Sequence, residues 1–279
     1  PRIQSPNLDR FADEGMRFTQ CYAACAVCSP SRSAILTGRT PYRNGVWRWI
    51  PEGSQYHLRE SETSIARLLR EQGYATCHVG KWHLNGKFKS HDQPQPDDHG
   101  YDWWLATQNN ARPNHINPAY YVRNRQATGK LEGPSAVVAV EEAIRWLKQE
   151  KNEDKPFFLT VWTHEPHQPI ESAERFMQPY QDIEDGGLRQ HHGNITQLDH
   201  AFGLLMSALD ELGDSDDTLV IFTSDNGPEG SGTRTGSRTR GSTGGLRGRK
   251  RHTHEGGIRV PGIVRWSGHI KPGSVCDTP

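Results

Sequence analysis

Hydrophobic and polar positions along the chain predict alternating helices and strands. Apolar residues spaced three or four positions apart mark helices at residues 6–14, 29–37, 61–72, 135–151 and 188–212. Apolar runs or strict alternation mark strands at residues 16–23, 74–81, 155–163, 217–223 and 257–266. Helices that alternate with strands indicate an α/β fold, with a mostly parallel central sheet and helices on both of its faces.

Individual segments carry finer predictions. The continuous apolar run in 217–223 predicts a strand covered on both faces. Residues 87–132 are rich in Pro, Asn, Asp and aromatic side chains without a clear period, so we interpret them as an irregular excursion near the substrate. Ser29 and Pro30 are typical of an N-cap and a first helical residue, which puts Cys28 just before that helix. The inward face of helix 61–72 is expected to consist of Ile65, Leu68 and Leu69.

The composition of the chain argues against several classes of protein. The 279 residues contain no strongly periodic repeat, which favours one domain over residues 1–279. Lys plus Arg and Asp plus Glu number 33 each, so the net charge gives no general attraction to nucleic acid or to an anionic membrane. No segment has the roughly 20 apolar residues of a membrane span, and the first residues lack the layout of a signal peptide. The abrupt ends suggest a fragment truncated at both ends, and five cysteines argue against a disulfide framework.

Polar side chains follow several of the predicted strands, at the edge where open parallel sheets bind ligands. This edge combines two oxygen donors suited to a hard cation, several cationic or hydrogen-bonding groups and one nucleophile, a set that fits an anionic, tetrahedral substrate. The candidate site residues are Cys28, Arg32, Lys81, His83, His167, Asp225, Asn226 and Lys250.

Each of these features also has a structural interpretation. "SDNG" is common as a turn closed by an Asx hydrogen bond, although its position after a strand favours a functional role. His164 and His167 could cap a strand end, and for His164 we favour that interpretation. The loop 228–257 holds seven Arg or Lys against two Glu, and many such loops are simply solvated. Its place between two core strands favours an active-site loop over a nucleic-acid arm.

The cysteines allow one further hypothesis. Cys21, Cys25 and Cys28 have the C-x3-C-x2-C spacing of radical enzymes that bind an iron–sulfur cluster and S-adenosylmethionine. This hypothesis gives no role to the other polar residues of the edge. It also puts Cys21 inside a predicted strand, so we disfavour it.

The stretch "CSPSRSAILTGR" resembles the signature C-x-P-S-R…L-T-G-R of the sulfatases, which belong to the alkaline-phosphatase superfamily. "GKWHL", "TLVIFTSDNGP" and "EGGIRVPGIVRW" are similar to further blocks of that family, in the family's order. Over almost the whole chain the sequence looks like arylsulfatases and N-acetylgalactosamine-6-sulfatases. The resemblance implies a sulfuric ester hydrolase that acts on a sulfated carbohydrate or an aryl sulfate.

The resemblance also implies how the reaction proceeds. Cys28 would be converted by a separate formylglycine-generating enzyme to Cα-formylglycine, whose aldehyde hydrates to a gem-diol. One hydroxyl would attack sulfur and the second would help to expel sulfate, which splits one difficult step into two. Arg32 would stabilise the hydrate, Lys81 would hold the hydrate and the sulfate, and His83 would act as the base that opens the covalent intermediate.

The remaining site residues have implied roles as well. His167 and Lys250 correspond to the positions that bind sulfate and protonate the leaving group. Asp225 and Asn226 correspond to two ligands of a Ca²⁺ or Mg²⁺ ion that acts as a Lewis acid. The family supplies two further ligands as an Asp-Asp pair upstream of "PNLDR", so the chain is expected to hold half of a metal site and, alone, to bind metal weakly.

Other consequences of the resemblance remain expectations. The family's location is mostly exported or lysosomal, which suggests a periplasmic, secreted or lysosomal protein. Two alternative functions stay open: a formylglycine-dependent phosphodiesterase or phosphonate monoester hydrolase, and an inactive carbohydrate-binding remnant.

Overall fold

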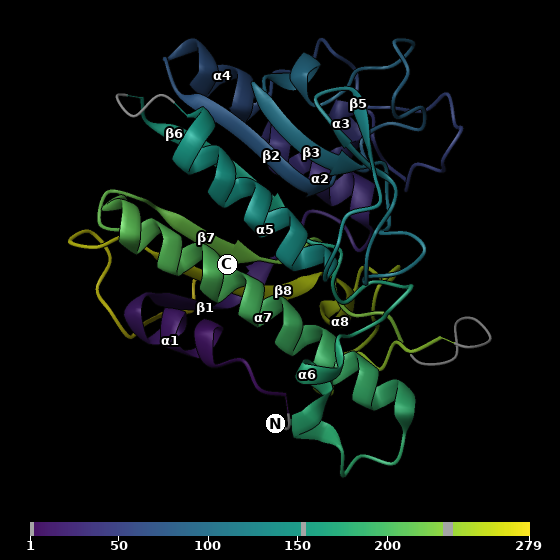
Figure 1. Cartoon of the computed structure of the whole chain (residues 1–279), viewed down its shortest axis with the longest axis vertical. Helices are drawn as coiled ribbons and strands as arrows, with labels where there is room; N and C mark the ends of the chain where they lie inside the picture. The colour runs from purple at the N-terminus through teal and green to yellow at the C-terminus, as the bar shows by residue number, and fades with distance from the viewer. Residues whose placement is uncertain (1–2, 152–154, 231–236) are drawn as a thin grey trace.

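Two sheets and the helices that cover them make up the chain (Figure 1). The computed structural model describes residues 3–151, 155–230 and 237–279. The helices are α1 (Pro6–Glu14), α2 (Cys28–Thr37), α3 (Pro41–Asn44), α4 (Ile65–Glu71), α5 (Ser135–Arg145), α6 (Glu174–Met177), α7 (Gly186–Leu212) and α8 (Glu255–Ile258). Shorter helical turns of 3-10 or π type are η1 (Asp97–His99), η2 (Trp146–Glu150) and η3 (Gln178–Tyr180). The strands are β1 (Met16–Tyr22), β2 (Ala75–Lys81), β3 (Trp103–Thr107), β4 (Tyr121–Arg123), β5 (Gln126–Gly129), β6 (Phe157–Trp162), β7 (Val220–Thr223), β8 (Arg259–Arg265) and β9 (Ser274–Cys276).

The sheets are both mixed. The five-stranded sheet has the order β5-β4-β3-β2-β6, and β2 runs parallel to both β3 and β6. The four-stranded sheet has the order β7-β8-β1-β9, in which β1 is parallel to β9 and antiparallel to β8. The expected α/β class is confirmed, with the strands distributed over two mixed sheets. Strands that follow one another through short turns, such as β4 and β5, pair antiparallel because no crossover separates them.

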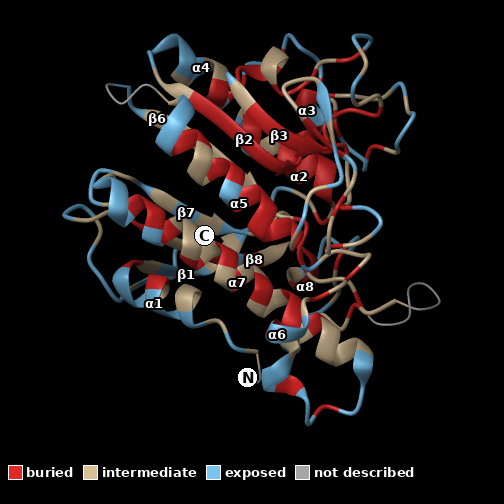
Figure 2. Cartoon of the chain, in the orientation of Figure 1, coloured by how far each residue is buried: buried red, intermediate tan, exposed pale blue. Residues whose placement is uncertain are grey.

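Helices lie on both faces of the five-stranded sheet, as the sequence predicts (Figures 1 and 2). One buried cluster joins α1, α5 and α7 to Cys77, Val79 and Leu105 of β2 and β3. A second cluster lies on the opposite face, where Trp104 and Ala106 of β3 meet apolar residues of α2 and α4. The two sets of β3 residues alternate along the strand, so both faces of this strand are buried. None of the helices in the described ranges is both long and apolar enough to cross a membrane.

Two predictions about the buried faces of segments are wrong. The strand at 217–223 is not covered on both faces: Ile221 of β7 is 63% exposed, so one face of this edge strand is open. In α4 the predicted inward residues Ile65 and Leu68 are exposed, and the buried residue is Ala66. The backbone of Gly100 packs directly against α4 beside Ala66: a Cβ at Gly100 would lie 2.4 Å from the Arg67 backbone nitrogen.

The segment 87–132 also differs from its prediction, because it contains β3, β4 and β5. β3 lies next to β2 near the middle of the five-stranded sheet and is almost fully buried. Its apolar core of Trp104, Leu105 and Ala106 is too short for a period to be recognised in the sequence.

Candidate active site

Cys28 is the first residue of α2 and is almost completely buried. Val27, in extended conformation, is the N-cap, so the helix begins earlier than the Ser-Pro pattern predicts. Ser29 is not the cap. Its hydroxyl oxygen accepts a hydrogen bond from the Ile50 amide at 3.1 Å. The side chain at position 28 therefore lies at the positive end of the α2 dipole, which favours an anion.

Arg32, one turn further along α2, connects the two sheets. Its Nε and Nη2 contact Oδ2 of Asp225, just after β7, at 2.9 and 2.7 Å. Its Nη1 donates to the backbone oxygen of Lys81 at the end of β2, at 3.0 Å. The guanidinium also lies over the ring of Trp162, the last residue of β6, 5.0 Å from its centroid. One buried arginine thus brings together the ends of three strands.

Gly80 determines how β2 ends. Its φ of +103° is unfavourable for other residues. A Cβ at this position would lie 2.1 Å from the backbone oxygen of Trp162 on the neighbouring strand β6. Only glycine permits this close approach of the two strands, which immediately precedes Lys81.

Lys81 and Lys250 are both nearly buried: the exposed fraction is 2% for Lys81 and 5% for Lys250. Among the described residues, neither ammonium donates a hydrogen bond or forms an ion pair with a side chain. The pKa of Lys81 is lowered to about 8, mainly because burial disfavours its charge. Electrostatic interactions with Cys28 and Asp225 raise this pKa, whereas the positive charges of Arg32 and Lys250 lower it. Cys28, Arg32, Asp225 and Lys250 therefore all lie within electrostatic reach of the Lys81 ammonium.

His83 follows Lys81 in the left-handed backbone region, at φ +60°. Its Nε2 lies 3.1 Å from the Ile50 backbone oxygen, which can only accept, so Nε2 carries the proton. The buried Nδ1 then has a free lone pair, and it has no partner in the described part of the chain. Burial and the positive charges of Lys81 and Arg32 hold the pKa of His83 well below its usual value. His83 is therefore a neutral imidazole with one available acceptor atom.

The charges of this group lower the pKa values of both His167 and His164, but the two imidazoles have different hydrogen-bond partners. The Nδ1 of His167 lies 2.7 Å from the Gln168 backbone oxygen, which leaves Nε2 as the acceptor. Its pKa is lowered well below the usual value by burial and then by the charges of Lys81 and Lys250. His164 is buried and bonded through Nε2 to the Thr107 hydroxyl at 2.7 Å, which agrees with its interpretation as a strand-end residue.

Asp225 and Asn226 provide two oxygen donors that suit a hard cation. Burial raises the pKa of Asp225, but the positive charges of Arg32, Lys81 and Lys250 outweigh this effect and lower it, so the carboxylate is ionised. The Oδ1 of Asn226 is buried and has no hydrogen-bond partner among the described residues. A carboxylate beside an unpartnered amide oxygen fits part of a Ca²⁺ or Mg²⁺ site. Within the described ranges, no group of three or more His, Cys, Asp or Glu side chains could hold a metal ion.

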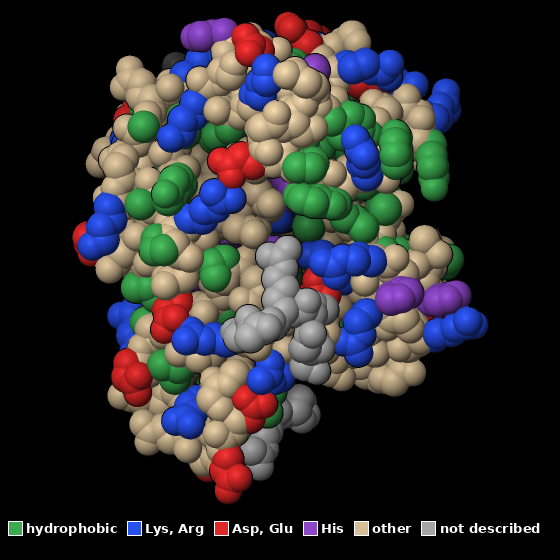
Figure 3. Space-filling view, turned by 90° about the vertical axis from the view of Figure 1, so that its right-hand side faces the viewer, with side chains coloured by type: hydrophobic (Ala, Val, Ile, Leu, Met, Phe, Trp, Pro, Cys, Tyr) green, Lys and Arg blue, Asp and Glu red, His purple; other side chains and the backbone are tan. Residues whose placement is uncertain are grey.

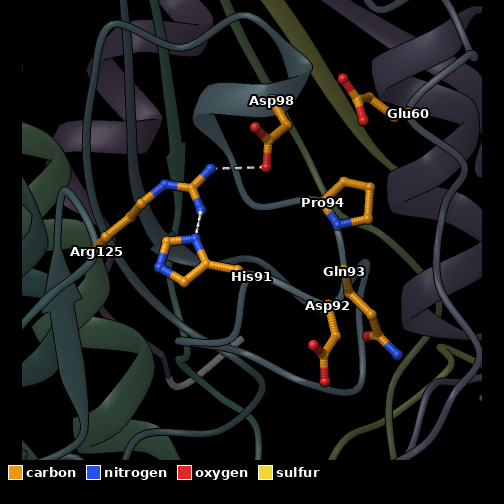
Figure 4. A pocket seen from close by; sticks show the side chains of 7 residues that line it. All are labelled: Glu60, His91, Asp92, Gln93, Pro94, Asp98 and Arg125. Carbon is orange, nitrogen blue, oxygen red and sulfur yellow. Dashed lines mark hydrogen bonds and ion pairs between the residues drawn. The ribbon is translucent and has the colours of Figure 1, made fainter.

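An open pocket lies elsewhere on the molecule (Figure 4). It has a volume of about 320 Å³, and none of the sequence-predicted site residues lines it. Its walls include Glu60, Asp92 and Asp98, and its Arg125 is paired with Asp98 at 2.8 Å. This excess of carboxylates makes the pocket unsuited to an anion, in contrast to the strand edge around Lys81.

Sequence reasoning missed two participants. Trp162 lies under the Arg32 guanidinium, and the rule that ligands bind at strand ends could have identified it, because it is the last residue of β6. Ile50 contacts the site only through its backbone, which no pattern of side chains reveals. The loop 228–257 supplies Lys250, and its residues 231–236 lie outside the described residues. Within its described part, Arg238 and Arg240 are already paired with carboxylates.

Comparison with known proteins agrees with this geometry. The family model described as Sulfatase matches residues 1–277. N-acetylgalactosamine-6-sulfatase of Mus musculus is 33% identical over 303 residues, covering 99% of this chain and 55% of that protein. Arylsulfatase A of Homo sapiens is 33% identical over 306 residues, covering 98% and 56%. The crystal structure of Ps i-CgsB in complex with k-i-k-neocarrahexaose has a TM-score of 0.85 at 25% identity, covering 99% of this chain and 63% of that one. The chain thus spans about half the length of the curated relatives it matches.

Proposed function

The chain belongs to the sulfatase family, and from this premise we propose that the protein hydrolyses sulfate esters of carbohydrates or aryl alcohols. The observation that supports the proposal is the pair of nearly buried lysines, Lys81 and Lys250, whose positive charges both lower the pKa values of Asp225 and His167. Together with Arg32 they give three cations against the single carboxylate of Asp225. Such an uncompensated positive site is stabilised by an anionic ligand, and the sulfate ester is one.

The protonation state of each site residue determines the role that we propose for it. Lys81 has a pKa of about 8, so it is mostly charged at neutral pH and can hold sulfate oxygens. The neutral His83 can accept a proton at Nδ1. His167 offers Nε2 as a hydrogen-bond acceptor beside Lys250, whose ammonium can contact the ester oxygens and donate a proton to the leaving alcohol.

The family generally requires a formylglycine and a metal ion; Cys28 at the start of α2 fits the first, and Asp225 and Asn226 fit part of a site for the second. Formylglycine at position 28 would supply a nucleophilic oxygen, and a divalent cation held by Asp225 and Asn226 would supply a Lewis acid. Family membership also supports maturation by a formylglycine-generating enzyme and a periplasmic, secreted or lysosomal location.

The experiment measures turnover of 4-nitrophenyl sulfate and bis-4-nitrophenyl phosphate by the full-length protein, produced together with a formylglycine-generating enzyme. We expect preferential cleavage of the sulfate ester, which the Cys28→Ala variant loses without loss of folding. Mass spectrometry of the peptide that holds residue 28 reports its conversion. Faster cleavage of the phosphate diester would favour the phosphodiesterase alternative. Unmodified Cys28 without turnover would favour the inactive remnant.

A further inference from the structure

Trp49 combines high exposure with a contact to the site: it is 51% exposed, and its indole ring contacts His83, the candidate base. Its ring centroid lies 6.4 Å from that of His83. Exposing an indole to water is unfavourable, and exposed apolar groups beside a polar site commonly mark the place where a ligand packs. Figure 3 views the face at which the loops gather, and it shows hydrophobic side chains next to Lys and Arg side chains there.

The backbone that carries Trp49 is fixed relative to the reacting groups. Val46 and Ile50, on either side of it, are fully buried. The Ile50 amide donates to the Ser29 hydroxyl, next to the nucleophile position, at 3.1 Å. The Ile50 carbonyl accepts the His83 Nε2 proton. Trp49 is therefore anchored by its neighbour to both ends of the candidate site.

The surroundings of Trp49 indicate what kind of ring it can contact. Its neighbour Arg48 is exposed and lies over the rings of Trp47 and Tyr56, so it does not cover Trp49. Glu52, further along the segment, is paired with Arg112 at 2.8 Å. The indole thus offers an open apolar surface within a polar border, in contrast to the enclosed apolar slot that suits an aryl group. A sugar ring has the matching form, because its C–H groups form an apolar face and its hydroxyls lie at the rim.

We propose that Trp49 is a substrate-positioning residue that stacks against the sugar ring bearing the scissile sulfate, while the ester itself lies among Lys81, His83 and Lys250. The proposal rests on the proposed function and deepens it, because it assigns sulfated carbohydrate as the substrate class. Trp49 contributes to holding the sugar and makes no contribution to binding the sulfate group alone.

The test compares Trp49→Ala, Trp49→Phe and the matched control Trp47→Ala in the full-length matured protein. Trp47 is exposed to 57% and packs on Tyr56, outside the site. The readouts are kcat/KM on N-acetylgalactosamine 6-sulfate and other sulfated monosaccharides, kcat/KM on 4-nitrophenyl sulfate, and inhibition by inorganic sulfate. We expect Trp49→Ala to lower kcat/KM on the best sugar about 10-fold or more, mostly through KM, with sulfate inhibition changed less than about twofold. Trp49→Phe should recover most of the loss, and Trp47→Ala should resemble the wild type.

Different results would refute the stacking role of Trp49, the substrate class and the sulfatase activity. An unchanged sugar kcat/KM in Trp49→Ala, or a parallel loss of sulfate inhibition, would refute the stacking role. Turnover of aryl sulfates alone, or a larger loss on the aryl ester than on the sugar, would refute the substrate class while leaving sulfatase activity intact. Absence of all sulfate ester hydrolysis in the wild type would instead refute the proposed function, and the stacking role with it.

Discussion

Lys81 shows how a residue can be unfavourable for folding and useful for binding. Its ammonium is buried beside Arg32 and Lys250, and both positive charges lower its pKa. Desolvation and like-charge repulsion destabilise this arrangement in the absence of an anion. The same features strengthen the attraction for an anionic ligand, because the surroundings screen charge less than water does.

At the residue scale we predict that Lys81→Met separates activity from stability. The variant should lose about 100-fold or more in kcat/KM on 4-nitrophenyl sulfate, since one preorganised positive charge is gone. Its free energy of unfolding in urea should be unchanged or higher, because methionine fills the site without a desolvated charge. The exposed Lys148→Met is the control and should change neither quantity. Retained activity in Lys81→Met would show that this ammonium does not hold the substrate.

At the scale of single elements, the ends of β2 and β6 position the site. Gly80 allows β6 to approach β2: β6 ends at Trp162 opposite Gly80, and β2 ends one residue further on, at Lys81. Trp162 opposite Gly80 supports the Arg32 guanidinium. The close contact between these two strands therefore sets both the lysine and the arginine.

For these elements we predict that Gly80→Ala lowers the free energy of unfolding by about 3 kcal/mol or more. The new Cβ overlaps the Trp162 carbonyl, and alanine is disfavoured at positive φ. Gly129→Ala has a similarly positive φ of +75° but nothing within 4 Å, so it should cost only about 1–2 kcal/mol. Urea unfolding of both variants measures the difference. Equal costs would show that backbone strain, and not the contact with β6, explains the glycine.

At the scale of the whole molecule, several histidines are buried in the neutral form. Burial lowers the pKa of His78 to about 3 and those of His99 and His191 to about 4. In the unfolded chain the same side chains take up protons near pH 6.5. Between these values the unfolded state binds more protons than the folded state. Stability is therefore complete above about pH 6.5 and decreases as the pH falls towards 4.

For the molecule as a whole we predict that His99→Leu weakens this acid sensitivity. Each unit of lowered pKa corresponds to about 1.4 kcal/mol, so removing His99 should reduce the loss of stability between about pH 7.5 and about pH 4 by about 3 kcal/mol. The Nδ1 of His99 is buried and has no partner among the described residues, so leucine loses no hydrogen bond at that atom. Urea unfolding at several pH values gives the two curves. Parallel curves for the wild type and His99→Leu would contradict a neutral, buried His99.

The sequence by itself determined most helices and strands and the set of candidate side chains, because periodicity, caps and strand ends are local properties of the chain. The α/β class followed from their alternation, and α1, α5 and α7 lie close to their predicted positions. The sequence did not reveal β3. This strand is stabilised by neighbours on both faces, and its own residues show no recognisable period.

Only the tertiary structure decided how these parts meet. The division into two sheets, the exposure of β7 and the pairing of Arg32 with Asp225 depend on contacts between residues far apart in the chain. The same holds for the proton on His83 Nε2 and the anchoring of Trp49, both of which depend on the backbone of Ile50. Apart from proline, every residue carries the same backbone N–H and C=O groups, so their partners are set by the fold and cannot be recognised from the order of side chains.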